Sequence, residues 1–278
     1  MNHSLSPSAT LWLLAPLTVL LLVMFGYPLG LVAWSSIYVD GAFTLKAYQN
    51  LSGSTLFYRV LANTLHISAV ATLVSLVLGY IIALHLAAME PRRRLPYMVL
   101  VMLPFWTSIL VKSFAFSIVL GDNGIINQVA AFLTGRTDKF ELIFNRVGVI
   151  IGMSNFLLPF TVFPILASLL AQNRSLHRVA EIMGAGPIRI FLRITLPLSL
   201  PGVLAGVLMA MTLSMGMYIT PALLGGRKDL MMANLVDIYT RQTLDWGLAS
   251  AIAIVLLFMS GILIALLLRV RRAEGLGV

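Results

Sequence analysis

Few residues of this chain could do chemistry, and one of them, Lys112, lies inside a long apolar run. The chain contains no cysteine, which excludes disulfides and cysteine-based metal sites. No lysine ends a G-x-x-x-x-G-K-[ST] loop, so the sequence has no phosphate cradle. Gly152-Met153-Ser154-Asn155 is not the G-x-S-x-G turn of a serine hydrolase. We therefore expect no catalytic residue and no resident cofactor in this chain.

Two histidines, His66 and His85, fall in one apolar segment and are nineteen residues apart. A metal site needs more ligands that face one cavity, so we expect no metal here. Single polar groups in such segments are usually hydrogen-bonded between helices, and this is the expectation for both histidines.

Lys112 has two open interpretations. An ionisable residue inside an apolar segment is a functional candidate by default. The residue lies roughly 13 Å from the outer end of its segment at 1.5 Å per residue, and a lysine stem can snorkel part of that distance, so an interfacial anchor is the alternative. Other polar, aromatic and proline residues of the apolar segments could line a pathway beside it. With Lys112, the candidates are Trp106, Thr107, Ser108, Lys112, Asn155, Phe156, Pro159, Tyr218 and Thr220.

The composition is that of a membrane protein. Hydrophobic residues make up 59% of the 278 positions and charged residues only 10%, which is more apolar surface than a water-soluble core can bury. Six windows are almost free of charge, and each can supply the roughly 20 apolar residues of a spanning helix. They are Met1–Val39, Val60–Met89, Leu95–Gly121, Val147–Asn173, Ile194–Gly226 and Trp246–Leu268.

Six spans place both termini on one side of the membrane. The loops on that side hold ten basic residues against eight on the other, and Arg92–Arg94 cluster directly beside two spans. Basic loops stay in the cytoplasm, so we expect both termini and the 172–200 loop there. A signal peptide is the alternative for the first window, but it has no basic n-region and no clear A-x-A site, which favours an uncleaved helix.

The stretch Ser175–Pro201, called the hairpin below, is basic and amphipathic and lies between two apolar windows. Gly184-Ala185-Gly186 interrupts a helical pattern, and Pro187 suits the first position of a second helix. Pro197 and Pro201 are expected to end the unit. Such a hairpin is well shaped to dock in a groove of a soluble partner.

The hairpin resembles the EAA loop of permease subunits in ABC importers, which reads E-A-A, three residues, G, nine residues, I-x-L-P. Gly184 and Ile194-Thr195-Leu196-Pro197 have this spacing. The triplet falls on Arg178-Val179-Ala180, so Arg178 stands where the family has glutamate, only Ala180 matches, and Glu181 follows one place later. The resemblance implies that the ATPase-coupling residues are Arg178, Ala180, Glu181, Gly184, Ala185, Ile194, Leu196 and Pro197.

A second stretch is similar to the polyamine-type branch of that family, in which P-F-W-T-S precedes a basic residue and a later G-x-x-N. Here Pro104–Ser108, Lys112, Gly124 and Asn127 supply these elements, and Tyr218–Gly226 resembles the same branch. The resemblance covers about Phe57 to Leu266.

The resemblance implies an all-α integral membrane protein with the six-helix, MetI-like permease fold of type I ABC importers, as a single domain over residues 1–278. It implies a multi-pass protein of the bacterial inner membrane that forms half of a pathway for a polyamine or a related amine-bearing solute. The implied partners are a second homologous permease, two cytosolic ATPase subunits that hold ATP and Mg²⁺, an extracytoplasmic solute-binding protein and membrane lipid.

Three other classes of function are less well supported by the residues. A stand-alone secondary transporter usually needs intramembrane acids, and no Asp or Glu lies in the six windows. A membrane enzyme would rest on composition alone. A nucleic-acid module would have to reach DNA from between two spans, so we expect no nucleic-acid partner. Pro159 and Pro164 are expected to kink the fourth span and to mark it as a pathway helix.

Overall fold

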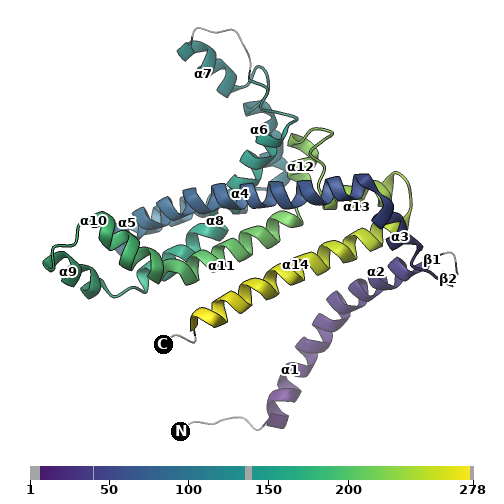
Figure 1. The fold of residues 1–278 in the computed structure, drawn as a ribbon, viewed down its shortest axis with the longest axis horizontal. Coiled ribbons are helices and arrows are strands. Elements are labelled where there is room, and N and C mark those ends of the chain that lie inside the picture. Colours follow the sequence, from purple (N-terminus) through teal and green to yellow (C-terminus); the bar gives the residue numbers. More distant parts are fainter. Residues whose placement is uncertain (1–6, 40, 135–139, 276–278) are drawn as a thin grey trace. The chain divides into compact units, whose positions relative to one another are not determined.

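The computed structural model describes residues 7–39, 41–134 and 140–275, and the regular secondary structure of this part is helical apart from two short strands (Figure 1). In chain order the elements are α1 Pro7–Leu21, the π-helical turn η1 Leu22–Gly26, α2 Tyr27–Ile37, β1 Tyr38–Val39, β2 Ala42–Phe43, α3 Lys46–Gly53, α4 Thr55–Ala88, α5 Pro91–Trp106, α6 Ile109–Val119, α7 Ile125–Thr134, α8 Arg146–Leu170, α9 Arg174–Ile182, α10 Pro187–Ile190, the π-helical turn η2 Phe191–Thr195, α11 Leu196–Met215, α12 Ile219–Leu224, α13 Met232–Arg241 and α14 Trp246–Gly275.

The six apolar windows correspond to five long helices and one bent pair. The five long helical segments are Leu13–Ile37, Thr55–Ala88, Arg146–Leu170, Pro187–Met215 and Trp246–Leu266. The third window differs from the expected single helix, because α5 and α6 meet at an angle of 94°. The fifth also differs: its helix ends at Met215, and α12 follows as a separate short helix.

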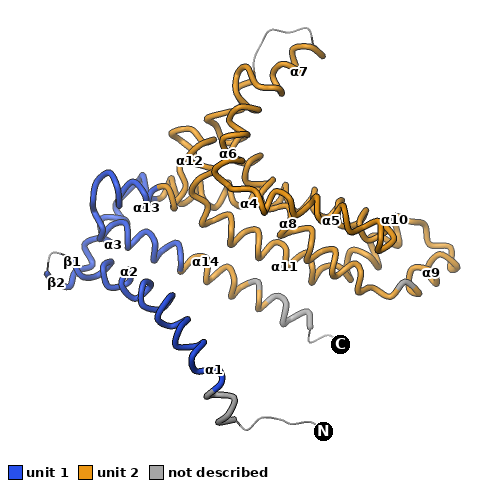
Figure 2. Tube along the Cα trace, turned by 180° about the vertical axis from the view of Figure 1, so that it is seen from behind, with its two compact units in different colours: residues 1–57, 235–257 blue, residues 58–234, 258–278 orange. Residues whose placement is uncertain are grey.

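The chain forms two compact units, which Figure 2 colours separately. One comprises residues 1–57 and 235–257, and the other comprises residues 58–234 and 258–278. In the first unit, β1 and β2 form an antiparallel strand pair in which Tyr38 lies opposite Phe43. The centroid of the Trp34 ring lies 5.2 Å from that of Tyr38 and 5.3 Å from that of Phe43, so these rings pack the strand pair against the end of α2.

Both π-helical turns end two residues before a proline. η1 ends at Gly26 and precedes Pro28, and η2 ends at Thr195 and precedes Pro197. Proline lacks an N–H and its ring presses on the carbonyl four residues earlier, so a widened turn lets the helix continue. The expectation that Pro197 and Pro201 end the hairpin is therefore wrong, because the helix runs from Pro187 to Met215 through both of them.

The helix α8 lies at the centre of the second unit, packed against α4 and α11 through small side chains (Figure 1). The Ser75 hydroxyl of α4 donates to the Ser154 carbonyl at 2.9 Å, and the Thr161 hydroxyl donates back to the Ser75 carbonyl at 3.0 Å. A Cβ added at Gly202 of α11 would lie 2.5 Å from the Pro164 carbonyl oxygen. These contacts explain the glycine and serine content of the spans, since only small residues allow such close approach.

α8 runs unbroken from Arg146 to Leu170 with Pro159 and Pro164 inside it, and the expected kink stays a prediction. One other detail differs from expectation. His66 and His85 are exposed on α4, and neither side chain is hydrogen-bonded, so the expected interhelical bonds are absent from this described helix.

One ion pair fastens the loop that follows α12. The Arg146 guanidinium pairs with Asp229 at 3.2 Å and donates to the Asn63 side-chain oxygen at 2.7 Å. The Asn63 amide in turn donates to the Lys228 carbonyl at 2.6 Å. Asp229 is buried, so its charge needs this partner. The network holds the loop against the ends of α4 and α8.

Candidate functional site

The first candidate site lies where α5 and α6 are broken. Thr107 and Ser108 have extended backbone angles, so the last carbonyls of α5 have no partners in a following turn. Side chains donate hydrogen bonds to one of these carbonyls instead. The Thr107 hydroxyl donates to the Pro104 carbonyl at 3.1 Å, and the Lys112 ammonium donates to the same carbonyl. Pro104 begins the P-F-W-T-S stretch but was not among the nine candidate pathway residues.

Lys112 is directed toward this break. Its ammonium nitrogen also lies 5.0 Å from the centroid of the Phe156 ring on α8, within the range of a cation–π contact. The C-terminal end of a helix carries partial negative charge, so a cation there is favourable. The side chain is half-buried and reaches back to Pro104 rather than toward Gly121, which differs from the geometry of an interfacial anchor.

A cavity of about 290 Å³ lies beside the ammonium. It is lined by Leu103, Pro104, Thr107, Lys112, Ala115, Phe116, Val119 and Asn155. The structure thus brings three of the nine candidate pathway residues, Thr107, Lys112 and Asn155, to one cavity, with Phe156 in contact with the lysine. Phe156 continues into an aromatic row with Phe160 and Phe105, each centroid 5.6 Å from the next.

The other candidates lie apart from this cavity. Trp106 and Ser108 are exposed at the break, and Pro159 is buried in α8. Thr220 is buried, 3.4 Å from Ser113 of α6 between the hydroxyl oxygens. The carbonyl of Tyr218 accepts from the Asn234 amide at 3.0 Å, which ties the start of α12 to α13.

The G-x-x-N element shapes the turn after α6. A Cβ on Gly124 would lie 2.2 Å from the Val119 carbonyl oxygen, so no other residue fits. The Asn127 amide donates to the Gly121 carbonyl at 3.1 Å and to the Phe140 carbonyl at 3.0 Å, and its oxygen accepts from the Phe140 N–H at 2.8 Å. Asn127 therefore fastens α7, which begins at Ile125, to the segment before α8.

The second candidate site is the hairpin. α9 ends in a Schellman motif, in which the Gly184 N–H donates to the Glu181 carbonyl and the Ala185 N–H donates to the Ala180 carbonyl, both at 2.9 Å. Gly184 has φ +80°, the conformation that glycine adopts without strain. Pro187 stands at the first turn of α10, as the sequence indicates. Four of the eight candidate coupling residues thus form this one cap.

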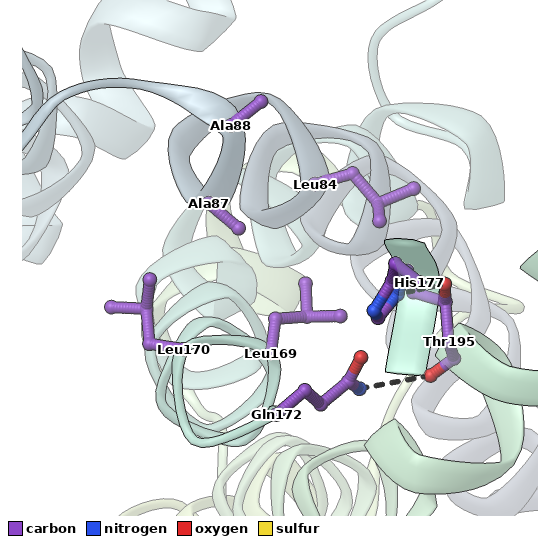
Figure 3. Close-up of a pocket in the computed structure, with 8 residues that line it drawn as sticks. All are labelled: Leu84, Ala87, Ala88, Leu169, Leu170, Gln172, His177 and Thr195. Atoms are coloured by element: carbon purple, nitrogen blue, oxygen red, sulfur yellow. Dashed lines mark hydrogen bonds between the residues drawn. The ribbon is translucent and has the colours of Figure 1, made fainter. Parts of the chain in front are cut away.

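Two polar side chains that were not among the candidates, Gln172 after α8 and His177 on α9, contact Thr195 of the hairpin. The Gln172 amide donates to the Thr195 carbonyl at 3.0 Å, and the His177 Nε2 lies 3.1 Å from the Thr195 hydroxyl. These side chains line a cavity of about 370 Å³ together with Leu84, Ala87, Ala88, Leu169 and Leu170, as Figure 3 shows. The remaining candidates Ile194, Leu196 and Pro197 continue from Thr195 into α11.

The turn of the hairpin presents large apolar side chains to the outside. Ile182 is 85% exposed, Met183 81% and Ile188 75%. Arg178 and Glu181 flank this surface on α9, where both are exposed and form no ion pair with each other, although their spacing allows one. An apolar surface bordered by charges is typical of a protein contact.

The family model described as "Binding-protein-dependent transport system inner membrane component" matches residues 75–271. The chain belongs to this family. It is 32% identical over 235 residues to the spermidine/putrescine transport system permease protein PotB of Escherichia coli, which covers 84% of this chain and 85% of the relative. PotB of Haemophilus influenzae is 30% identical over 221 residues, or 80% of this chain and 77% of the relative.

The fold is shared with solved ABC transporters. A chain of a bacterial alginate ABC transporter, in complex with its alginate pentasaccharide-bound periplasmic protein, superposes with a TM-score of 0.74 at 18% identity over 93% of both chains. As a member of the family, the chain is a transport permease of the bacterial inner membrane, with ATP hydrolysis in a partner subunit. It works with other components such as a binding protein and an ATPase. This membership overrides the alternative of a stand-alone secondary transporter.

Proposed function

We propose that this permease imports a polyamine or a closely related amine-bearing solute and forms half of the pathway beside a second homologous permease. Two cytosolic ATPase subunits drive it, and an extracytoplasmic binding protein delivers the solute. The observation that carries the substrate class is the pair of groups that hold the Lys112 ammonium at the break between α5 and α6, a carbonyl and an aromatic face, because both attract cations. The two spermidine/putrescine relatives support the same class.

In this proposal the hairpin couples the permease to an ATPase. Its exposed apolar turn fits a groove of a soluble partner, as amphipathic helices commonly do. The bonds of Gln172 and His177 to Thr195 support a mechanical role, because they connect the end of α8 and the helix α9 to the residue that precedes α11. The membrane orientation that follows has both termini and the hairpin in the cytoplasm, in agreement with the basic cluster Arg92–Arg94.

The function is tested by reconstitution of the complete importer in vesicles. We expect ATP-dependent uptake of spermidine or putrescine that requires the binding protein. Uptake of another solute by the same importer, with no polyamine transported, would contradict the substrate class but not the role as a permease.

Replacing Arg178 by glutamate tests how the hairpin meets its ATPase. We expect Arg178→Glu to lower transport-coupled ATP hydrolysis, because an exposed arginine in place of the usual glutamate implies an acidic group on the partner. Exposed ion pairs contribute about 0.2–1 kcal/mol, so the loss is expected to be a few-fold. The measurement is ATPase activity in vesicles with loaded binding protein. Arg189→Glu, on the second helix of the hairpin, is the matched control. Unchanged or raised coupling in Arg178→Glu would refute a matched partner acid.

Single cysteines in this cysteine-free chain test whether α8 lines the pathway. The positions are Asn155, Phe156, Phe160 and Phe163, all partly exposed on α8. We expect a water-soluble thiol reagent to label a subset that includes Asn155, since it lines the cavity at Lys112, and labelling should change with ATP. A cysteine at Met153, which is fully buried, serves as the negative control. Protection of all four positions would assign α8 to packing alone.

A further inference from the structure

We propose that the break between α5 and α6 is a binding site for a primary ammonium group, and that Lys112 is its tethered occupant, which the ammonium of the solute displaces during transport. The inference rests on the proposed function for the identity of the solute. Binding of a primary amine at the break does not depend on which solute is imported, and the experiment below measures this binding without transport.

The end of α5 supplies the electrostatics of such a site. The Pro104 carbonyl accepts from both the Thr107 hydroxyl and the Lys112 ammonium. A helix that ends at membrane depth presents free carbonyls and the negative end of its dipole, and broken helices of transporters hold cations in this way. None of the residues that line the cavity at this site carries a carboxylate. The site therefore holds an ammonium through a carbonyl and an aromatic ring, and no acid forms a lasting ion pair with it.

Phe156 supplies the second half of the site. Its ring lies 5.0 Å from the lysine nitrogen, and a cation over an aromatic face gains most where water is excluded. Lys112 and Pro104 both line the cavity of about 290 Å³, so a second amine has room near them. Carbonyl, aromatic ring and adjacent space are what an alkylammonium chain requires.

Because the Lys112 ammonium is attached to the chain, the site distinguishes a solute delivered into the cavity from free amines in solution. A ligand on a short linker acts at an effective concentration on the order of millimolar, so dilute free amines do not displace Lys112. A solute molecule released into the confined cavity is itself at a concentration in the molar range and can exchange with the lysine. When the solute leaves, the ammonium of Lys112 returns and the site does not retain the solute.

The experiment is chemical rescue of Lys112→Ala in the purified importer complex. n-Butylammonium has the four carbons and the ammonium of the whole lysine side chain, one carbon more than alanine removes, and we expect it to raise the melting temperature of this variant but not that of the wild type. If lysine fills the site about nine-tenths of the time, its removal tightens amine binding about tenfold. Putrescine should act in the same way, and the neutral n-butanol should not.

Two further variants control the result. Lys228→Ala removes an exposed lysine of the second unit and should show no response to amines beyond that of the wild type. Adding Phe156→Leu to Lys112→Ala should weaken the response, because the aromatic face is lost. Should Lys112→Ala fail to assemble, recovery of the complex in n-butylammonium becomes the readout, and the absence of recovery counts against the site. Equal stabilisation by n-butanol, or none by any amine, would overturn the inference. Failure to import polyamines would leave it intact.

Discussion

Lys112→Met is expected to abolish most uptake while the importer still assembles and hydrolyses ATP. Methionine keeps the length of the stem and removes the ammonium, so the Pro104 carbonyl loses its charged donor and the end of α5 loses its cap. A hydrogen bond to a charged group contributes about 1.5–3 kcal/mol, which corresponds to about a ten- to hundredfold change in rate. The measurement is uptake into vesicles beside ATPase activity with loaded binding protein, which we expect to be poorly stimulated.

Lys112→Arg is the matched control for this prediction. Arginine retains the charge and can donate to a carbonyl and lie over an aromatic ring, so uptake should be largely preserved. An interfacial anchor would tolerate methionine, because its stem remains in the apolar layer. Normal uptake in Lys112→Met, with normal stimulation of ATP hydrolysis by loaded binding protein, would therefore indicate that Lys112 is an interfacial anchor.

The second large effect is expected at Gly184. Valine there has to adopt φ +80°, which costs about 1–2 kcal/mol and is worse for a β-branched side chain. This strain destabilises the Schellman cap, which sets the direction of the chain from α9 to α10. We expect Gly184→Val to reach the membrane normally and to lower recovery of the ATPase on co-purification about five- to thirtyfold. No atom crowds this position, so the effect comes from backbone strain and not from a clash.

Gly186→Val is the control, two residues away in the same turn. Gly186 has φ −69° and ψ 163°, which any residue adopts before proline, and an added Cβ meets nothing within 4 Å. This variant should bind the ATPase as the wild type does. If Gly184→Val co-purifies and transports as well as Gly186→Val, the cap is not required for coupling.

The local features of this chain are those that the sequence determined by itself. Composition alone located the six apolar segments, because a span needs only sufficient length and apolarity. Gly184 and Pro187 indicated the turn of the hairpin, because positive φ and a missing N–H are properties of single residues. The spacing from Gly184 to Pro197 was enough to indicate the family, since a short motif requires no knowledge of distant contacts.

The tertiary structure decided which partners each polar group finds. The window around Lys112 reads as one continuous helix, because nothing local stops it at Thr107, yet the chain bends there by 94° and lysine bonds the carbonyl of Pro104. Phe156 contacts the lysine from another span. His177 contacts Thr195 across the hairpin, and Gln172 contacts it from the end of α8. Periodicity reports which face of a helix is apolar, but not which neighbour lies against it. These contacts form only when the helices pack, so the sequence alone did not predict them.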